Sequence, residues 1–219
     1  MKTILLAALL MLAPSAAFSY DDADPEMKTL LDTFFDLVPC PSPEGAPMTN
    51  SGLCPRALAL LSGGSDRLAT YLIRQYESAI EPVPPISRWT YLRLLGHTES
   101  ETAVLYLSAL AQREADAYAA NPADDSALRF ALEGLGRTRD LRAIPVAFAV
   151  LDRFPDEDEV RLRALGALDR VQAKHGPQPA IRAKLEALAP AAALAGTGRH
   201  GRVAERAEKI LTTPGATYP

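Results

Sequence analysis

The segment between residues 127 and 171 constrains the fold more than any other part of the chain. Its first half is apolar up to Gly136, a polar turn follows at 137–140, and a second apolar run carries Pro145. A third apolar-periodic run begins at Asp158. Leu and Ala at helical spacing on both sides of the turn predict a helical hairpin followed by the first helix of the next. Divergent copies lie on either side, so we expect hairpins that bury their apolar faces against one another.

The same signals predict the other helices. Asp24 and Pro25 are a cap and a first helical residue, and an apolar face follows to Val38. The expected hairpins pair residues 55–63 with 65–79, 86–96 with 100–119, 125–135 with 140–154, and 158–173 with 179–188, and a last helix covers 202–211.

Three local signals are expected to shape the turns between these helices. Gly96 and Gly136 are expected to end their helices, Gly136 by a positive φ. The run from Thr98 to Glu101 fits a capping box, and Asp140 is expected to cap the helix after it.

The residues at the helix ends and on the apolar stripes of 125–173 resemble short HEAT-like repeats of the phycobilisome-lyase type. These residues are Leu135, Gly136, Asp140, Ala143, Ile144, Pro145, Val160, Arg161, Ala164, Ala167 and Leu168. Weaker likeness extends to 95–98 and 203–207, and none precedes Pro55. The resemblance implies an all-α, right-handed α-solenoid of about four helical hairpins. The His-Glu pairs with which HEAT-like deoxyhypusine hydroxylase binds iron do not occur, and the repeat alone does not imply bilin-lyase chemistry.

Residues 1–19 have the layout of a secretory signal peptide, with Lys2, an apolar run at 4–13 and small residues before Ser19. The apolar run is about ten residues long, whereas a membrane span needs about twenty. We therefore expect cleavage after Ser19, with Ala17 as the alternative, and a periplasmic or secreted protein.

Cys40 and Cys54 flank a Pro- and Gly-rich loop, and an exported chain with one such pair is expected to form a disulfide. The expected organisation is a signal peptide (1–19), an N-terminal helix and cysteine loop that cap the array (20–54), a HEAT-like helical domain (55–213) and a tail (214–219).

No set of residues predicts catalysis, a cofactor or a metal site. His97, His175 and His200 fall at helix ends or in turns, where the helix dipole favours them. The acidic run 156–159 lacks the ligand spacing of a calcium loop and suits the first turn of a helix.

Arg137, Arg139 and Arg142 could form an anion-binding cluster. The alternative is that Arg and Asp residues such as Arg161 and Asp140 pair between neighbouring hairpins.

The net charge of −4 makes nucleic acid an unsuitable partner. We therefore expect a non-enzymatic scaffold that binds an unidentified protein of the cell envelope. An enzyme or ligand carrier with a groove between repeats, and a structural envelope component, are the alternatives. The candidate partner-binding residues are Tyr106, Arg113, Val146 and Arg153, on helices expected to line a concave side. The alternative for Tyr106 and Val146 is that they only pack between hairpins.

Overall fold

The computed structural model describes residues 24–37, 59–61, 66–78, 88–122, 124–194 and 201–214, and their regular secondary structure is entirely helical. The helices are α1 (Pro25–Leu37), α3 (Asp66–Ser78), α4 (Arg88–His97), α5 (Glu101–Ala120), α6 (Ser126–Thr138), α7 (Ala143–Arg153), α8 (Asp158–His175), α9 (Pro179–Leu194) and α10 (Gly201–Thr212). The expected all-α class is confirmed. The proposed signal peptide, Cys40, Cys54 and His200 lie outside the described residues. No helix in the described part is long and apolar enough to cross a membrane.

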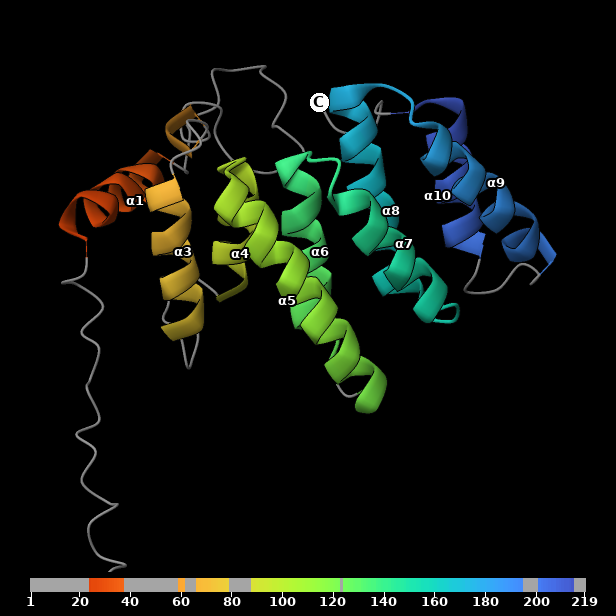
Figure 1. The fold of residues 1–219 in the computed structure, drawn as a ribbon, viewed down its shortest axis with the longest axis horizontal. Coiled ribbons are helices and arrows are strands. Elements are labelled where there is room, and N and C mark those ends of the chain that lie inside the picture. Colours follow the sequence, from red (N-terminus) through yellow and green to blue (C-terminus); the bar gives the residue numbers. More distant parts are fainter. Residues whose placement is uncertain are drawn as a thin grey trace, which may run out of the picture.

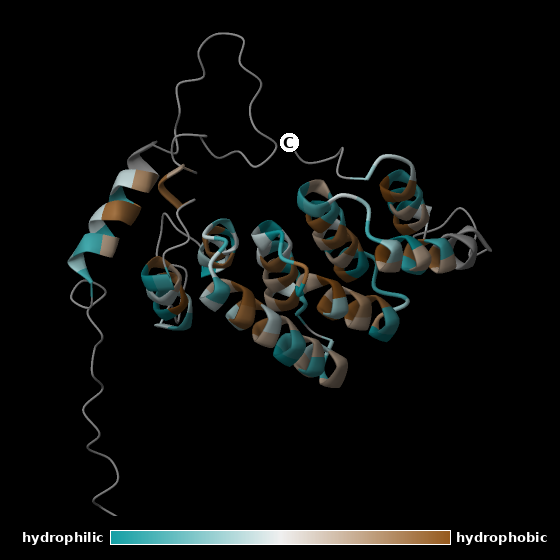
Figure 2. Ribbon diagram, turned by 45° about the horizontal axis from the view of Figure 1, so that its top comes forward, coloured by the Kyte–Doolittle hydropathy of each residue, from teal (hydrophilic) through white to brown (hydrophobic). Residues whose placement is uncertain are grey.

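The helices pack in two rows (Figures 1 and 2). In the first row, α4 packs on α6, α6 on α8, and α8 on α10. In the second row, α3 packs on α5 and α5 on α7, while Lys184 of α9 pairs with Asp152 of α7. The rows also pack on each other, mainly through α5 with α6, α7 with α8 and α9 with α10.

The hydrophobic core lies between the two rows, where apolar residues gather on the facing sides of the helices (Figure 2). Leu92, Leu107, Leu132 and Leu168 are fully buried there. Burying each leucine side chain contributes about 1.5–3 kcal/mol relative to leaving it in water. This shared core holds the helices of the first row at fixed positions, so the polar residues on their outer faces are fixed as well.

The starts of α1 and α5 were predicted correctly, but the caps predicted at Thr98 and Asp140 are wrong. α7 begins at Ala143, its N-cap position is Arg142, and no side chain caps it. The N–H of Met27 donates to Asp24 Oδ1 at 3.2 Å, as expected of a cap. The cap of α5 is Ser100, whose hydroxyl accepts the N–H of Ala103 at 3.0 Å. The capping box that was predicted to begin at Thr98 is therefore wrong.

The expected roles of Gly96 and Gly136 are also wrong. α4 and α6 continue past these glycines, and the positive φ angles belong to Glu99 (49°) and Arg139 (54°). A Cβ at Gly96 would lie 2.2 Å from the carbonyl oxygen of Gly134, and one at Gly136 would lie 2.6 Å from the Cα of the facing α8 residue. Both glycines therefore allow neighbouring first-row helices to approach closely.

Candidate functional site

The α4–α5 and α6–α7 turns have the same geometry and fix the ends of the first-row helices. In each turn, a threonine hydroxyl donates to the carbonyl three residues earlier and accepts the N–H two residues later. The distances are 2.8 and 3.4 Å for Thr98, and 2.6 and 3.3 Å for Thr138. The residue after each threonine has a positive φ. This local hydrogen bonding, with no glycine at the left-handed position, turns the chain from one row to the other.

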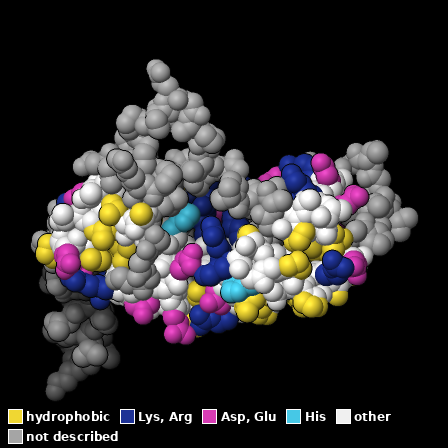
Figure 3. All heavy atoms as spheres, turned by 90° about the horizontal axis from the view of Figure 1, so that it is seen from above, with side chains coloured by type: hydrophobic (Ala, Val, Ile, Leu, Met, Phe, Trp, Pro, Cys, Tyr) yellow, Lys and Arg dark blue, Asp and Glu magenta, His cyan; other side chains and the backbone are white. Residues whose placement is uncertain are grey.

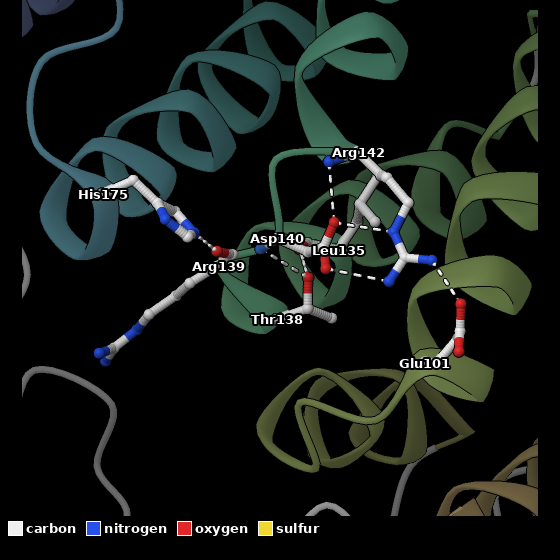
Figure 4. Close-up of polar contacts among 7 residues, drawn as sticks. All are labelled: Glu101, Leu135, Thr138, Arg139, Asp140, Arg142 and His175. Atoms are coloured by element: carbon white, nitrogen blue, oxygen red, sulfur yellow. Dashed lines mark hydrogen bonds and ion pairs between the residues drawn. The ribbon is translucent and has the colours of Figure 1, made fainter.

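The α6–α7 turn is joined to its neighbours on both sides (Figure 4). The N–H and guanidinium of Arg142 donate to Asp140, and its Nη1 donates to Glu101 at the start of α5 at 3.0 Å. On the other side, His175 Nε2–H donates to the carbonyl of Arg139 at 2.8 Å. The side chain of Arg139 extends away from the turn in this view.

Two predictions about these charged residues need correction. Arg161 does not pair with Asp140, because its Nη1 donates to the carbonyl of Pro155 at 2.7 Å. Arg137 and Arg142 do not form one anion cluster either, since each donates to different carboxylates. Arg and Asp or Glu residues do pair between neighbouring hairpins, as expected. Here the pairing residue is Arg142, and its partners are Asp140 in the same turn and Glu101 of α5.

Three arginines from three helices converge on one buried carboxylate, Glu133 of α6. Its Oε1 accepts Arg93 Nε at 2.9 Å and Arg137 Nη2 at 2.8 Å, and its Oε2 accepts Arg163 Nη1 at 3.3 Å. The Glu133 side chain is 3% exposed, whereas those of Arg93 and Arg163 are 45% and 38% exposed. Burial favours the protonated carboxyl, but the arginines outweigh it and hold the pKa of Glu133 below its ordinary value. The cluster joins α4, α6 and α8 and carries an excess of positive charge.

His97 lies beside this cluster, in a strongly positive environment. Arg137 Nη1 donates to His97 Nε2 at 2.8 Å, so the imidazole is neutral and carries its proton on Nδ1. Burial, followed by the charges of Arg137, Arg170 and Arg139, lowers the pKa of His97 to about 3. The last helical residue of α4 therefore acts as a hydrogen-bond acceptor for an arginine.

An open hollow of about 270 Å³ lies between α8 and α10, next to the Glu133 cluster. It is lined by Glu159, Leu162, Arg163, Gly166, Arg170 and Arg206. Arg206 donates at 2.9 Å to the fully buried carboxylate of Asp169, which orients its guanidinium beside the hollow.

We call Arg93, Arg137, Arg163, Arg170 and Arg206 the arginine face; all five are on first-row helices. Lys and Arg side chains gather beside two histidines in the middle of the side shown in Figure 3. The sequence patterns did not single out Glu133, although its i, i+4 spacing to Arg137 was a visible signal.

The candidate partner-binding residues lie on the second row, where several of them join neighbouring helices. Val146 is 4% exposed and packs in the core, in line with the alternative that it only packs between hairpins. Tyr106 is partly buried and donates to Glu77 of α3 at 3.2 Å. Burial, with Glu77, raises its pKa.

The two arginines of that set are exposed. Arg153 pairs with Asp116 of α5, and Arg113 pairs with the adjacent Glu114. Partner binding by the four residues stays a prediction, although Val146 offers almost no surface for it.

Within the described ranges, no three His, Cys, Asp or Glu side chains lie together as a metal site. Comparison of the chain with protein-family models, curated proteins and solved structures finds no match.

Proposed function

We propose that the chain is an exported, non-enzymatic scaffold of HEAT-like repeats that binds a protein partner through the arginine face. In this proposal the two helix rows are the first and second helices of successive hairpins in a right-handed α-solenoid, located in the periplasm or outside the cell. The observation that carries the binding surface is the convergence of Arg93, Arg137 and Arg163 on the single carboxylate of Glu133. Arginine is among the residues most enriched at interaction hot spots.

The paired turns support the repeat architecture. Thr98 and Thr138 make the same two hydrogen bonds, and the residues before them, His97 and Arg137, are 40 residues apart. Polar bridges also recur between helices of the same row, as in Arg153 with Asp116. A repeat array needs such nearest-neighbour contacts, because each unit is stabilised mainly by the units beside it.

The charged lining of the open hollow favours a macromolecular partner over a small ligand. Small-molecule sites are enclosed and mostly apolar. The hollow here, about 270 Å³, is open, and three of its six lining residues are arginines. It suits one or two side chains of a partner that continues over the neighbouring helices.

Affinity capture tests the proposal. The tagged full chain is expressed in its native cell, and proteins retained after washing are quantified by mass spectrometry against an untagged strain. We expect one protein to be retained in near-equal amount to the bait. Recovery of the bait alone, after chemical cross-linking as well as without it, would overturn the proposal.

A further inference from the structure

We infer that the arginine face binds an acidic segment of the partner protein, with carboxylates entering the hollow between α8 and α10. The inference deepens the proposed function and rests on it. It commits to a peptide segment carrying several Asp or Glu residues, held by arginines of α4, α6, α8 and α10.

The charge balance of the cluster is the first argument. Arg93, Arg137 and Arg163 share the one carboxylate of Glu133, so two positive charges are not balanced within the cluster. Arg93 donates only its Nε–H to Glu133, and Arg163 only an Nη1–H. A guanidinium has five N–H donors, and both side chains are more than a third exposed. Several donors therefore remain for incoming carboxylates.

The hollow supplies a place for such a carboxylate. Arg163 and Arg170 flank it from α8, and Gly166 lies between them without a side chain. Arg206 faces it from α10 and is already oriented by Asp169. A carboxylate between guanidiniums can accept paired, charge-assisted hydrogen bonds, which are shorter and stronger than neutral ones.

The spacing fits an extended segment. Arg163 and Arg170 are two helical turns apart, about 10 Å along the axis at 1.5 Å per residue. Three residues of extended chain span about the same distance. Arg93, Arg137 and Arg163 all donate to Glu133, so their guanidiniums gather at the Arg163 end of this span.

Binding of a defined probe tests this inference. Fluorescein-labelled hexaglutamate is titrated with the purified protein at low ionic strength and followed by fluorescence anisotropy, with hexaglutamine as the neutral probe. We expect saturable binding of hexaglutamate, no binding of hexaglutamine, and weakening as salt is raised.

A matched pair of double variants locates the binding. Arg163→Gln with Arg170→Gln removes two charges from the hollow. Arg67→Gln with Arg182→Gln removes two exposed charges from α3 and α9 of the second row. We expect the first pair to weaken hexaglutamate binding about tenfold or more and the second to change it less than about twofold. Circular dichroism shows whether each variant keeps its helical content.

Three results would overturn the inference: no hexaglutamate binding by the unchanged protein, equal weakening by the two double variants, or equally strong binding of a single-stranded oligonucleotide of the same charge. Failure here is distinguishable from failure of the proposed function. A captured protein partner that binds the Arg163→Gln, Arg170→Gln variant unchanged refutes the acidic segment and leaves the scaffold standing. Hexaglutamate binding without any captured protein refutes the scaffold.

Discussion

Replacing Glu133 with glutamine should destabilise the protein far more than the same change at an exposed ion pair. The Glu133 side chain is 3% exposed and its partner Arg137 is 10% exposed, so the variant leaves a nearly buried guanidinium without its counter-charge. We assign about 2 kcal/mol to the Arg137 hydrogen bond. Arg93 and Arg163 are nearly half exposed, so each adds only about 0.5 kcal/mol. The expected loss is about 3 kcal/mol, or a Tm lower by roughly 6–12 °C.

The matched control is Glu101→Gln, because Glu101 also pairs with an arginine, Arg142, but its side chain is 70% exposed. That change should cost less than about 0.5 kcal/mol. Urea unfolding followed by circular dichroism at pH 7 gives both values, provided the slope with denaturant is unchanged. If Glu133→Gln costs no more than Glu101→Gln, the cluster does not stabilise the fold as described.

The difference in free energy of unfolding between the Glu133→Gln variant and the unchanged protein should also depend on pH. The folded-state pKa of Glu133 lies below its ordinary value, so its contribution is fully present above about pH 4.5. It is lost as the pH falls through the folded-state pKa, because protonation removes the charge that the arginines stabilise. The difference in free energy of unfolding should therefore be largest near neutral pH and should fall towards zero in acid. A gap that stays constant down to the lowest pH at which both proteins fold contradicts this reasoning.

Three further predictions concern packing, protonation and the cysteine loop. Gly96→Ala should cost about 1–3 kcal/mol in urea unfolding, because its Cβ would meet backbone at 2.2 Å, whereas Gly201→Ala has open space and should not destabilise. His97 should stay neutral from pH 8 to pH 5 in a two-dimensional NMR titration, because its pKa is lowered to about 3. The protein should lose stability below about pH 6.5, where the unfolded chain takes up a proton that the folded chain does not. An imidazole that titrates near pH 6.5 would contradict the burial of His97. Peptide mapping without reductant should find Cys40 bonded to Cys54, and two free thiols would refute the disulfide.

Local signals predicted the fold class well and the site poorly. Asp24 identified the start of α1 because a cap is a contact between residues three apart in sequence. Gly96 and Gly136 were misread because their role is set by facing helices about 30 to 40 residues away, which sequence spacing does not reveal.

Charge pairing was the hardest feature to predict, for the same reason. Glu133 gains Arg93 and Arg163 only once α4, α6 and α8 pack side by side, so only Arg137 could have been found from sequence. The sequence pattern places Val146 away from the main apolar stripe, but a helix in a two-row array packs on neighbours as well as on its partner and buries that side too.

Site-specific photo-cross-linking tests most directly whether the first row is the binding surface. A photoreactive amino acid is placed at position Arg202 of α10, whose side chain is 61% exposed and pairs with Glu159 at the hollow. The control position is Leu105 of α5, which is 57% exposed on the second row. After irradiation of living cells, we predict a discrete protein adduct from position 202 and none from position 105. An adduct from position 105 alone, or from neither position, would contradict the assignment of the arginine face as the binding surface.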